Sequence, residues 1–296
     1  MRRLIITADD FGAAPEVNAA VETCHRQGVL SAASLMVAAP AAAAAVALAR
    51  MMPSLRVGLH LVLVDGRPVS PPGDVPDLVD AAGRFRDDMA RAGATMFFNP
   101  SARRQLAAEI SAQFRAFTAT GLPLDHVNAH KHFHLHPTIA GLILKIGSRH
   151  GMTAARIPIE PREVLRKVEP GGSYAPSPII DAWAALARRR FRRAGIAVPD
   201  HVFGLKWSGA MTARRLAGLI EQAPDGLSEI YLHPATSGGF PGSAAAYRYA
   251  EEMAALIDPQ VVKAASAATC LRGGFTDFGS PGGAARLGDD RLERRG

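Results

Sequence analysis

The sequence predicts an α/β protein of barrel-like form, a distorted β/α barrel with about seven parallel strands. Short runs rich in aliphatic and β-branched residues alternate with longer helical patterns along the chain, which is the order expected of a parallel sheet covered by helices. Hydrophobic residues make up 48% of the 296 residues and charged residues 21%. This composition supplies a buried core and excludes a chain that is disordered throughout.

The predicted elements follow one another from the first residues onward. We expect strands at 4–8, 33–38, 56–61, 125–129, 155–159, 201–206 and 228–233. Helices are expected at 14–27, 40–51, 101–120, 138–150, 178–194, 212–223 and 243–257. The helix at 40–51 has proline in its first turn, where the missing backbone N–H breaks no hydrogen bond.

Two segments depart from this alternation. Residues 65–99 contain Pro-rich and Gly-rich stretches, and we interpret them as a loop insertion over one end of the sheet. Residues 276–296 are rich in Gly, Asp and Arg, which predicts a flexible C-terminal tail. We therefore expect a single domain over residues 1–275.

Charge and cysteine content limit the partners and the compartment. The formal net charge is +7, but no motif with interleaved basic and aromatic residues accompanies it, so we predict no nucleic-acid partner. Two cysteines cannot form a disulfide framework. The most apolar stretch, 35–49, is shorter than the roughly 20 residues of a membrane span. We expect a cytoplasmic protein, or one bound peripherally at the inner face of the membrane; the sequence does not predict its oligomeric state.

The first strand ends in two adjacent carboxylates, Asp9 and Asp10. Ionised groups at the end of an apolar strand need a positive or hydrogen-bonding partner, and a metal ion is one such partner. Neighbouring residues at a strand end point to different sides, so one acid could bind a cation while the other acts as a base. The alternative is that one of them caps the following helix.

Histidine is concentrated in one segment: five of the ten histidines lie within residues 126–136. In extended conformation, all four alternating histidines, His130, His132, His134 and His136, would share one face, and a solvent-exposed histidine-rich loop is the alternative. His60 lies in the apolar strand at 56–61, where it is either a ligand or a buried core residue. Gly58, which precedes it in the strand, would permit close packing.

One carboxylate with two imidazoles leaves coordination positions open, as a catalytic metal requires. These ligands favour zinc or another first-row transition metal over magnesium, which prefers oxygen ligands. A bound divalent ion could activate water, Asp9 could take the proton of that water, and His233 could protonate the leaving group. His233 closes the strand at 228–233, where it could instead only satisfy a loop carbonyl. Glu229, upstream in that strand, could orient a neighbouring group.

These motifs together resemble the YdjC-like carbohydrate deacetylases, whose barrel-like α/β fold is related to that of polysaccharide deacetylases. The resemblance rests on residues 7–12 (TADDFG), 58–60 (GLH), 130–134 (HKHFH) followed by Pro137, and 229–234 (EIYLHP). It implies Asp10, His60 and His130 as ligands of one divalent metal ion, Asp9 as base and His233 as acid. Supporting or substrate-binding roles are assigned to Asn128, His132, His134, Arg156 and Glu229.

Two residues depart from the family pattern. Asn128 stands where the family usually has aspartate, and Ala235 where it usually has glycine. If the usual acid orients a ligand, asparagine can still form the hydrogen bond but brings no charge, which affects the tuning of His130.

Within the family, the pattern is most similar to the hopanoid-associated branch. This similarity implies removal of the acetyl group from N-acetylglucosaminyl bacteriohopanetetrol, so the expected partner is an amino-sugar or glycolipid substrate.

Residues 179–193 lead from apolar side chains into five arginines. Such a segment could lie on an anionic membrane surface, or it could be an ordinary amphipathic helix. The alternative functions are a chitooligosaccharide deacetylase, a metal-dependent phosphoesterase, an iron oxygenase and a non-catalytic metal-binding protein.

Overall fold

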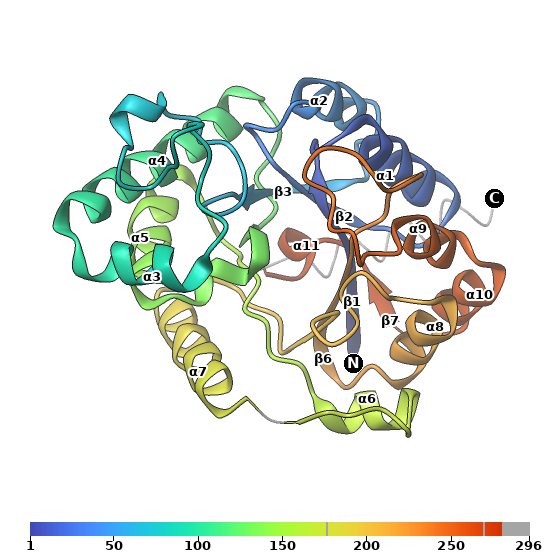
Figure 1. Cartoon of the computed structure of the whole chain (residues 1–296). Helices are drawn as coiled ribbons and strands as arrows, with labels where there is room; N and C mark the ends of the chain where they lie inside the picture. Colours follow the sequence, from blue (N-terminus) through green and yellow to red (C-terminus); the bar gives the residue numbers. More distant parts are fainter. Residues whose placement is uncertain (176, 269, 280–296) are drawn as a thin grey trace.

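The computed structural model describes residues 1–175, 177–268 and 270–279. In this part of the chain, seven parallel strands form one curled sheet with helices around it (Figure 1). The strands are β1 (Arg2–Phe11), β2 (Ala32–Leu35), β3 (Arg56–Leu61), β4 (Val127–Ala129), β5 (His201–Phe203), β6 (Gly226–Leu232) and β7 (Cys270–Arg272). The predicted α/β, barrel-like class is confirmed.

The strand order is β4-β3-β2-β1-β6-β5, and β7 pairs with the start of β1. The strand predicted at 155–159 forms only isolated bridges, because Pro158 has no N–H to continue a ladder. Residues 155–159 still connect the two edge strands, β4 and β5. The N–H of Arg156 donates to Val127 of β4, and the N–H of Val202 in β5 donates to Ile159. The sheet therefore curls into a distorted barrel.

Six predicted helices are present with small shifts at their ends: α1 (Pro15–Gln27), α2 (Ala42–Arg50), α4 (Pro100–Ala119), α5 (Pro137–Gly147), α7 (Pro178–Arg193) and α8 (Ala213–Gln222). Of the helix predicted at 243–257, only α9 (Tyr249–Ile257) is helical. Four helices were not predicted: α3 (Met89–Phe98), α6 (Arg162–Val168), α10 (Pro259–Ala267) and α11 (Phe275–Gly279). Short 3-10 turns form at Pro72–Asp74, His130–Leu135 and Ser148–His150. The segment predicted as a loop insertion thus contains a helix, α3. Within the described residues, no helix has the length and apolar character needed to cross a membrane.

The alternation of β1 separates the helix-facing core from the barrel interior. Leu4 and Ile6 belong to the large apolar cluster that includes helix residues, whereas Ile5 belongs to a smaller cluster with Phe275 at the base of the barrel. Thr7 and Asp9 follow Ile5 at two-residue intervals, so they share its face of the strand. The interior is therefore apolar at its base and polar toward the carboxyl ends of the strands.

Helix α11 packs against the base of the barrel. Asp125 accepts hydrogen bonds from the backbone N–H groups of Phe275 and Thr276, and Arg56 forms an ion pair with Asp277. Residues 276–279 of the predicted flexible tail are thus helical and packed, because the buried Phe275 and Phe278 anchor them. Residues 280–296 lie outside the described part of the chain.

Candidate metal centre and active site

The two carboxylates at the end of β1 line the same cavity, which has a volume of about 510 Å³. The pairing register between β1 and β2 shifts between Ala8 and Phe11, and Asp10 has a left-handed backbone with φ of 62°. Aspartate adopts this conformation more readily than most residues. The local kink lets Asp9 and Asp10, although adjacent, both reach the mouth of the barrel.

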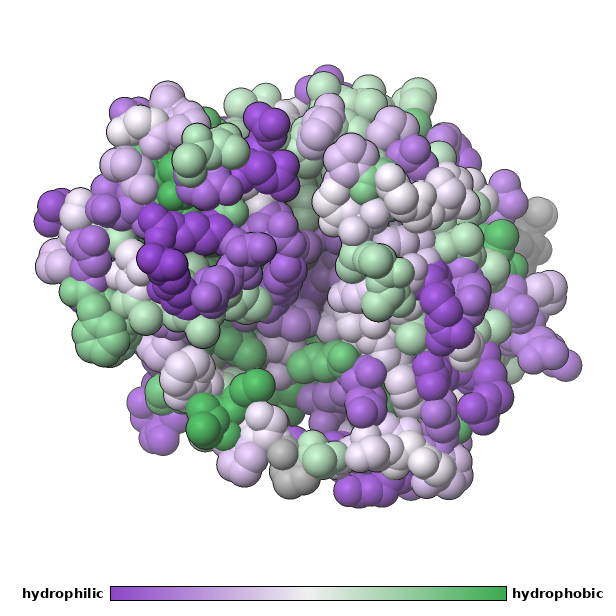
Figure 2. Space-filling view, viewed as in Figure 1, coloured by the Kyte–Doolittle hydropathy of each residue, from purple (hydrophilic) through white to green (hydrophobic). Residues whose placement is uncertain are grey.

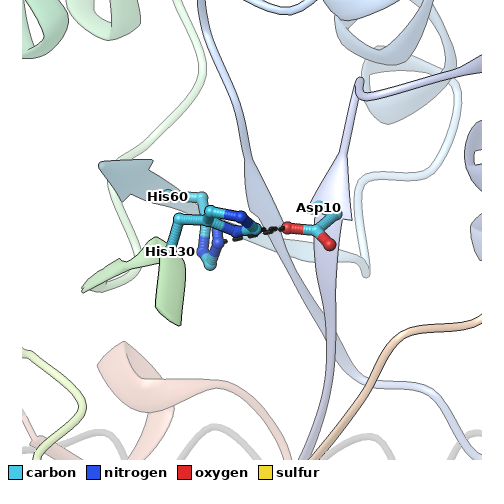
Figure 3. Close-up of side chains that lie close together, drawn as sticks. All are labelled: Asp10, His60 and His130. Atoms are coloured by element: carbon cyan, nitrogen blue, oxygen red, sulfur yellow. Dashed lines mark ion pairs between the residues drawn. The ribbon is translucent and has the colours of Figure 1, made fainter. Parts of the chain in front are cut away.

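Three predicted ligands converge in this cavity (Figure 3). Oδ1 of Asp10 lies 3.2 Å from Nε2 of His60 in β3 and 3.3 Å from Nδ1 of His130, which follows β4. All three atoms lie within 4.8 Å of one another. Oδ1 of Asp10 and Nε2 of His60 are buried and have no hydrogen-bond partner in the described part of the chain.

The hydrogen bond with Asn128 determines which nitrogen of His60 carries the hydrogen. The amide nitrogen of Asn128 donates to Oδ1 of Asp9 at 3.2 Å, so its oxygen faces Nδ1 of His60 at 2.7 Å. A carboxamide oxygen only accepts, so Nδ1 carries the hydrogen and the lone pair of Nε2 faces a carboxylate oxygen. Burial lowers the pKa of His60, but contacts with Asp10 and Asp9 outweigh it and raise this pKa above its ordinary value. The facing lone pairs require a proton or a cation, so the residues fit a divalent metal ion.

The role of Asn128 therefore differs from the sequence expectation. We expected residue 128 to influence His130, but its side chain orients His60. In the parallel pairing of β3 and β4, His60 and Asn128 are register partners, which places their side chains together.

Asp9 is held by Arg156 rather than by the three predicted ligands. Arg156 donates to Oδ2 of Asp9 at 2.5 Å and to Oδ1 at 2.9 Å, and it also donates to Glu229 at 2.6 and 2.9 Å. Burial raises the pKa of Asp9, but the charge of Arg156 outweighs it and holds this pKa well below its ordinary value. Thr7 also donates to Glu229 at 2.9 Å. The structure thus brings three of the predicted residues into one buried ion-pair group.

The histidine-rich segment is not extended, so the prediction that its histidines share one face is wrong. Residues 130–135 form a 3-10 turn in which Lys131 and His132 have φ of 53°. His132 lines the cavity and its Nε2 lies 2.8 Å from the hydroxyl of Tyr231, whereas His134 is buried behind it. Burial, reinforced by the charge of Arg156, lowers the pKa of His134 to about 3 and that of His132 well below its ordinary value. Both rings are neutral at physiological pH.

His233 lines the same cavity at the end of β6. Its backbone N–H donates to Oε2 of Glu252 at 2.6 Å, and its Nδ1 lies 4.0 Å from the same oxygen. Sequence reasoning missed Tyr231, which also lines the cavity and stacks on Arg156 at 4.4 Å. The signal was available: Glu229, Tyr231 and His233 are two residues apart in the strand predicted at 228–233, which would place them on one face.

Comparison with known proteins identifies the family. The model of the YdjC-like protein family matches residues 3–267. This chain belongs to the YdjC-like family.

Two relatives of this YdjC-like chain are named as carbohydrate deacetylases. The protein from Geobacillus stearothermophilus is 31% identical over 88% of this chain and 91% of its own length. The protein from Brevibacillus brevis is 39% identical over 53% of this chain, a match that covers 58% of the relative.

A crystal structure from Enterococcus faecalis V583, described as that of a candidate cellobiose-phosphate cleavage protein, has the same fold. It superposes with a TM-score of 0.74 at 22% identity and covers 94% of this chain and 98% of the other.

In this YdjC-like protein, a chain of buried hydrogen bonds runs from Asn128 to the base of the barrel. The amide of Asn128 donates to Ser34 at 2.9 Å, Oγ of Ser34 lies 2.9 Å from Nε2 of His126, and Nδ1 of His126 lies 2.9 Å from Asp125. An added Cβ on Gly58 would lie 2.5 Å from the His126 ring, so Gly58 does permit close packing, as predicted. Sequence reasoning did not assign Ser34 or Asp125, because their partnership depends on strand pairing.

Proposed function

We propose that this protein is a metal-dependent carbohydrate deacetylase that removes the N-acetyl group from an amino sugar. The observation that carries the proposal is the convergence of Asp10, His60 and His130 in a cavity that Asp9 and His233 also line. The names of the Geobacillus and Brevibacillus relatives support the reaction class. Two imidazoles and a carboxylate suit zinc or another first-row metal better than magnesium.

When bound, a divalent cation supplies an electrophile for the acetamide carbonyl and lowers the pKa of water. Asp9 accepts the proton of the attacking water: a carboxylate offers about four lone-pair positions, of which Arg156 and Asn128 occupy three. Arg156 keeps Asp9 ionised and fixes its orientation. His233 donates a proton to the nitrogen of the amide, so the C–N bond breaks to give acetate and the free amine.

For the substrate, we propose N-acetylglucosaminyl bacteriohopanetetrol, which becomes the glucosaminyl form. Support comes from the sequence similarity to the hopanoid-associated branch.

We also propose a cytoplasmic protein that contacts the inner face of the membrane through residues 179–193, since α7 exposes Ile179 and carries arginines in its last turn. Sedimentation with anionic lipid vesicles tests this contact, and a protein that stays in the supernatant would contradict it.

One experiment separates the proposal from its alternatives. Purified, metal-loaded protein is incubated with the N-acetylglucosaminyl hopanoid, with chitooligosaccharides and with a panel of phosphate esters, and acetate and phosphate are measured. We expect acetate from the hopanoid glycoside and none after chelation of the metal. Acetate from the soluble sugars alone would contradict the hopanoid substrate, and phosphate without acetate would contradict the deacetylase.

A further inference from the structure

A second, larger cavity lies beside the active site, between α3 and α7. It has a volume of about 640 Å³, within the range of small-molecule binding sites. Its walls include Phe97 and Ala94 of α3, Ile180 and Trp183 of α7, and His136 between them. The His136 ring centroid lies 6.1 Å from that of Phe97 and 6.4 Å from that of Trp183. The cavity therefore has an aromatic wall built from both helices.

This apolar groove is continuous with the active-site cavity. Four residues line both: Met89, Lys131, His132 and Leu205. Figure 2 shows the same relation on the surface, with hydrophobic side chains over the start of α7 next to the hydrophilic hollow at the centre of that face. A molecule seated at Asp10 and His60 can therefore extend into the groove without leaving the protein surface.

The apolar surface of the described residues is concentrated around this groove. Of the eight large hydrophobic side chains that are exposed among the described residues, six belong to α3 and α7: Phe97, Phe98, Ile179, Ile180, Trp183 and Leu186. Scattered exposed apolar residues are normal, but a contiguous group beside a polar site marks a ligand or partner surface. A free oligosaccharide offers apolar side chains only the C–H faces of its rings, so it would leave much of this group facing water.

We infer that the groove between α3 and α7 binds an apolar aglycone of the substrate, while the amino sugar lies at Asp10, His60 and His130. This inference rests on the proposed function and adds a binding site to it. The occupant is defined by chemistry: an amphiphile with an N-acetylated sugar at one end and an apolar body at the other. An occupied groove should then strengthen substrate binding. It should not change the rate at which the acetamide at Asp10, His60 and His130 is hydrolysed.

The first test compares two substrates that differ only in the aglycone. Methyl and n-octyl N-acetyl-β-glucosaminide are assayed with metal-loaded protein, the octyl compound below its micelle concentration. Each buried methylene improves affinity about fourfold, so we expect kcat/KM to be at least about tenfold higher for the octyl compound, mainly through KM. Equal kcat/KM values would overturn the inference.

A matched pair of variants locates the effect. Ala94 is exposed on α3 and lines only the groove, whereas Ala254 is exposed on α9 and lines none of the cavities described above. Ala94→Glu places a charge in the groove and should abolish the octyl preference, with the methyl compound changed less than about twofold. Ala254→Glu should leave both substrates unchanged. A preference that survives in Ala94→Glu would overturn the assignment to this groove.

A binding measurement separates this inference from the proposed function. The chain has two tryptophans; Trp183 is 43% exposed in the groove and Trp207 only 4% exposed. Octyl β-glucoside has no acetyl group, yet it should cause a saturable blue shift of tryptophan emission. Trp183→Phe and Ala94→Glu should both abolish this shift. Methyl glucoside, which has no apolar chain, should not cause it. If octyl β-glucoside causes the shift but no substrate is deacetylated, the proposed function is contradicted and the groove assignment is not. If the protein deacetylates substrates but shows neither the shift nor the octyl preference, only the groove assignment is contradicted.

Discussion

Asp9 and Asp10 are neighbours in the sequence, but their surroundings are opposite. The two oxygens of Asp9 accept three hydrogen bonds, two of them from the buried cation Arg156. Oδ1 of Asp10 faces nitrogens of two imidazoles and has no hydrogen-bond partner among the described residues. The charge of Asp9 is thus compensated by Arg156, whereas Asp10 requires a proton on a facing imidazole or a bound cation.

This difference teaches how one strand end can supply two kinds of chemistry. A carboxylate already paired with arginine gains little from a metal and stays ionised to accept a proton. A carboxylate that faces two imidazole nitrogens can bind a cation together with them. The kink at Asp10 separates the two environments within one peptide unit.

The largest expected effect comes from removing a ligand on the Asp10 side. His60→Ala or His130→Ala should reduce metal affinity by more than about 100-fold and bring deacetylation below detection. Metal content by mass spectrometry and acetate release measure the two effects. His150→Ala, whose ring stacks on Phe114, is the control and should keep both. Full metal occupancy in both ligand variants would refute the ligand assignment.

On the Asp9 side, the charge can be removed while the shape is kept. Asp9→Asn should retain the metal and lower kcat by about 10² to 10⁴, because the proton acceptor is lost. Asp10→Asn should instead lose the metal. If Asp9→Asn loses the metal and Asp10→Asn keeps it, the roles of the two acids are exchanged.

Removing the cation that compensates Asp9 should affect folding. Arg156→Met leaves Asp9 and Glu229 buried without a positive partner, so the free energy of unfolding should fall by about 3–5 kcal/mol. Urea denaturation measures this change. Arg214, 71% exposed and 3.5 Å from Glu169, provides the matched control, and Arg214→Met should change the free energy by less than about 1 kcal/mol. Equal effects of the two variants would mean that the buried group does not stabilise the barrel.

The smallest effect is expected at Asn128, which contacts both sides. Asn128→Ala removes the acceptor that orients His60, and metal affinity should fall about 10-fold to 100-fold. Titration of metal-free protein with zinc measures it. Ser34→Ala acts one hydrogen bond farther away and should weaken binding less. An unchanged affinity in Asn128→Ala would show that strand geometry alone orients His60.

The sequence was sufficient to predict the parts of the site that lie on strands. β1, β3 and β6 have strong apolar runs, and each ends at or near a polar group that reaches the cavity. The histidine segment was misread because alternation in sequence indicates one face only if the backbone is extended. At Lys131 and His132 the backbone is left-handed, a conformation with no clear sequence signal in non-glycine residues.

Long-range partnerships account for most of what the sequence could not show. Arg156 and Glu229 were assigned supporting roles, but their pairing joins residues 73 positions apart and that of Arg156 with Asp9 joins residues 147 apart. β7 has only three residues, too few for a periodic pattern. Pro158 was overlooked in the predicted strand at 155–159, although proline interrupts ladders.

The buried chain from Asn128 through Ser34 and His126 to Asp125 has a consequence for the divergence of relatives. Each member satisfies the donor or acceptor of the next, so a change at one position leaves a buried polar group unpaired unless its neighbour changes too. An aspartate at position 128 would replace the amide group that donates to Asp9 with a carboxylate, which has no hydrogen to donate when ionised. Relatives with that acid should therefore carry compensating residues at the positions of Ser34 and His126, and the identities at these three sites should covary.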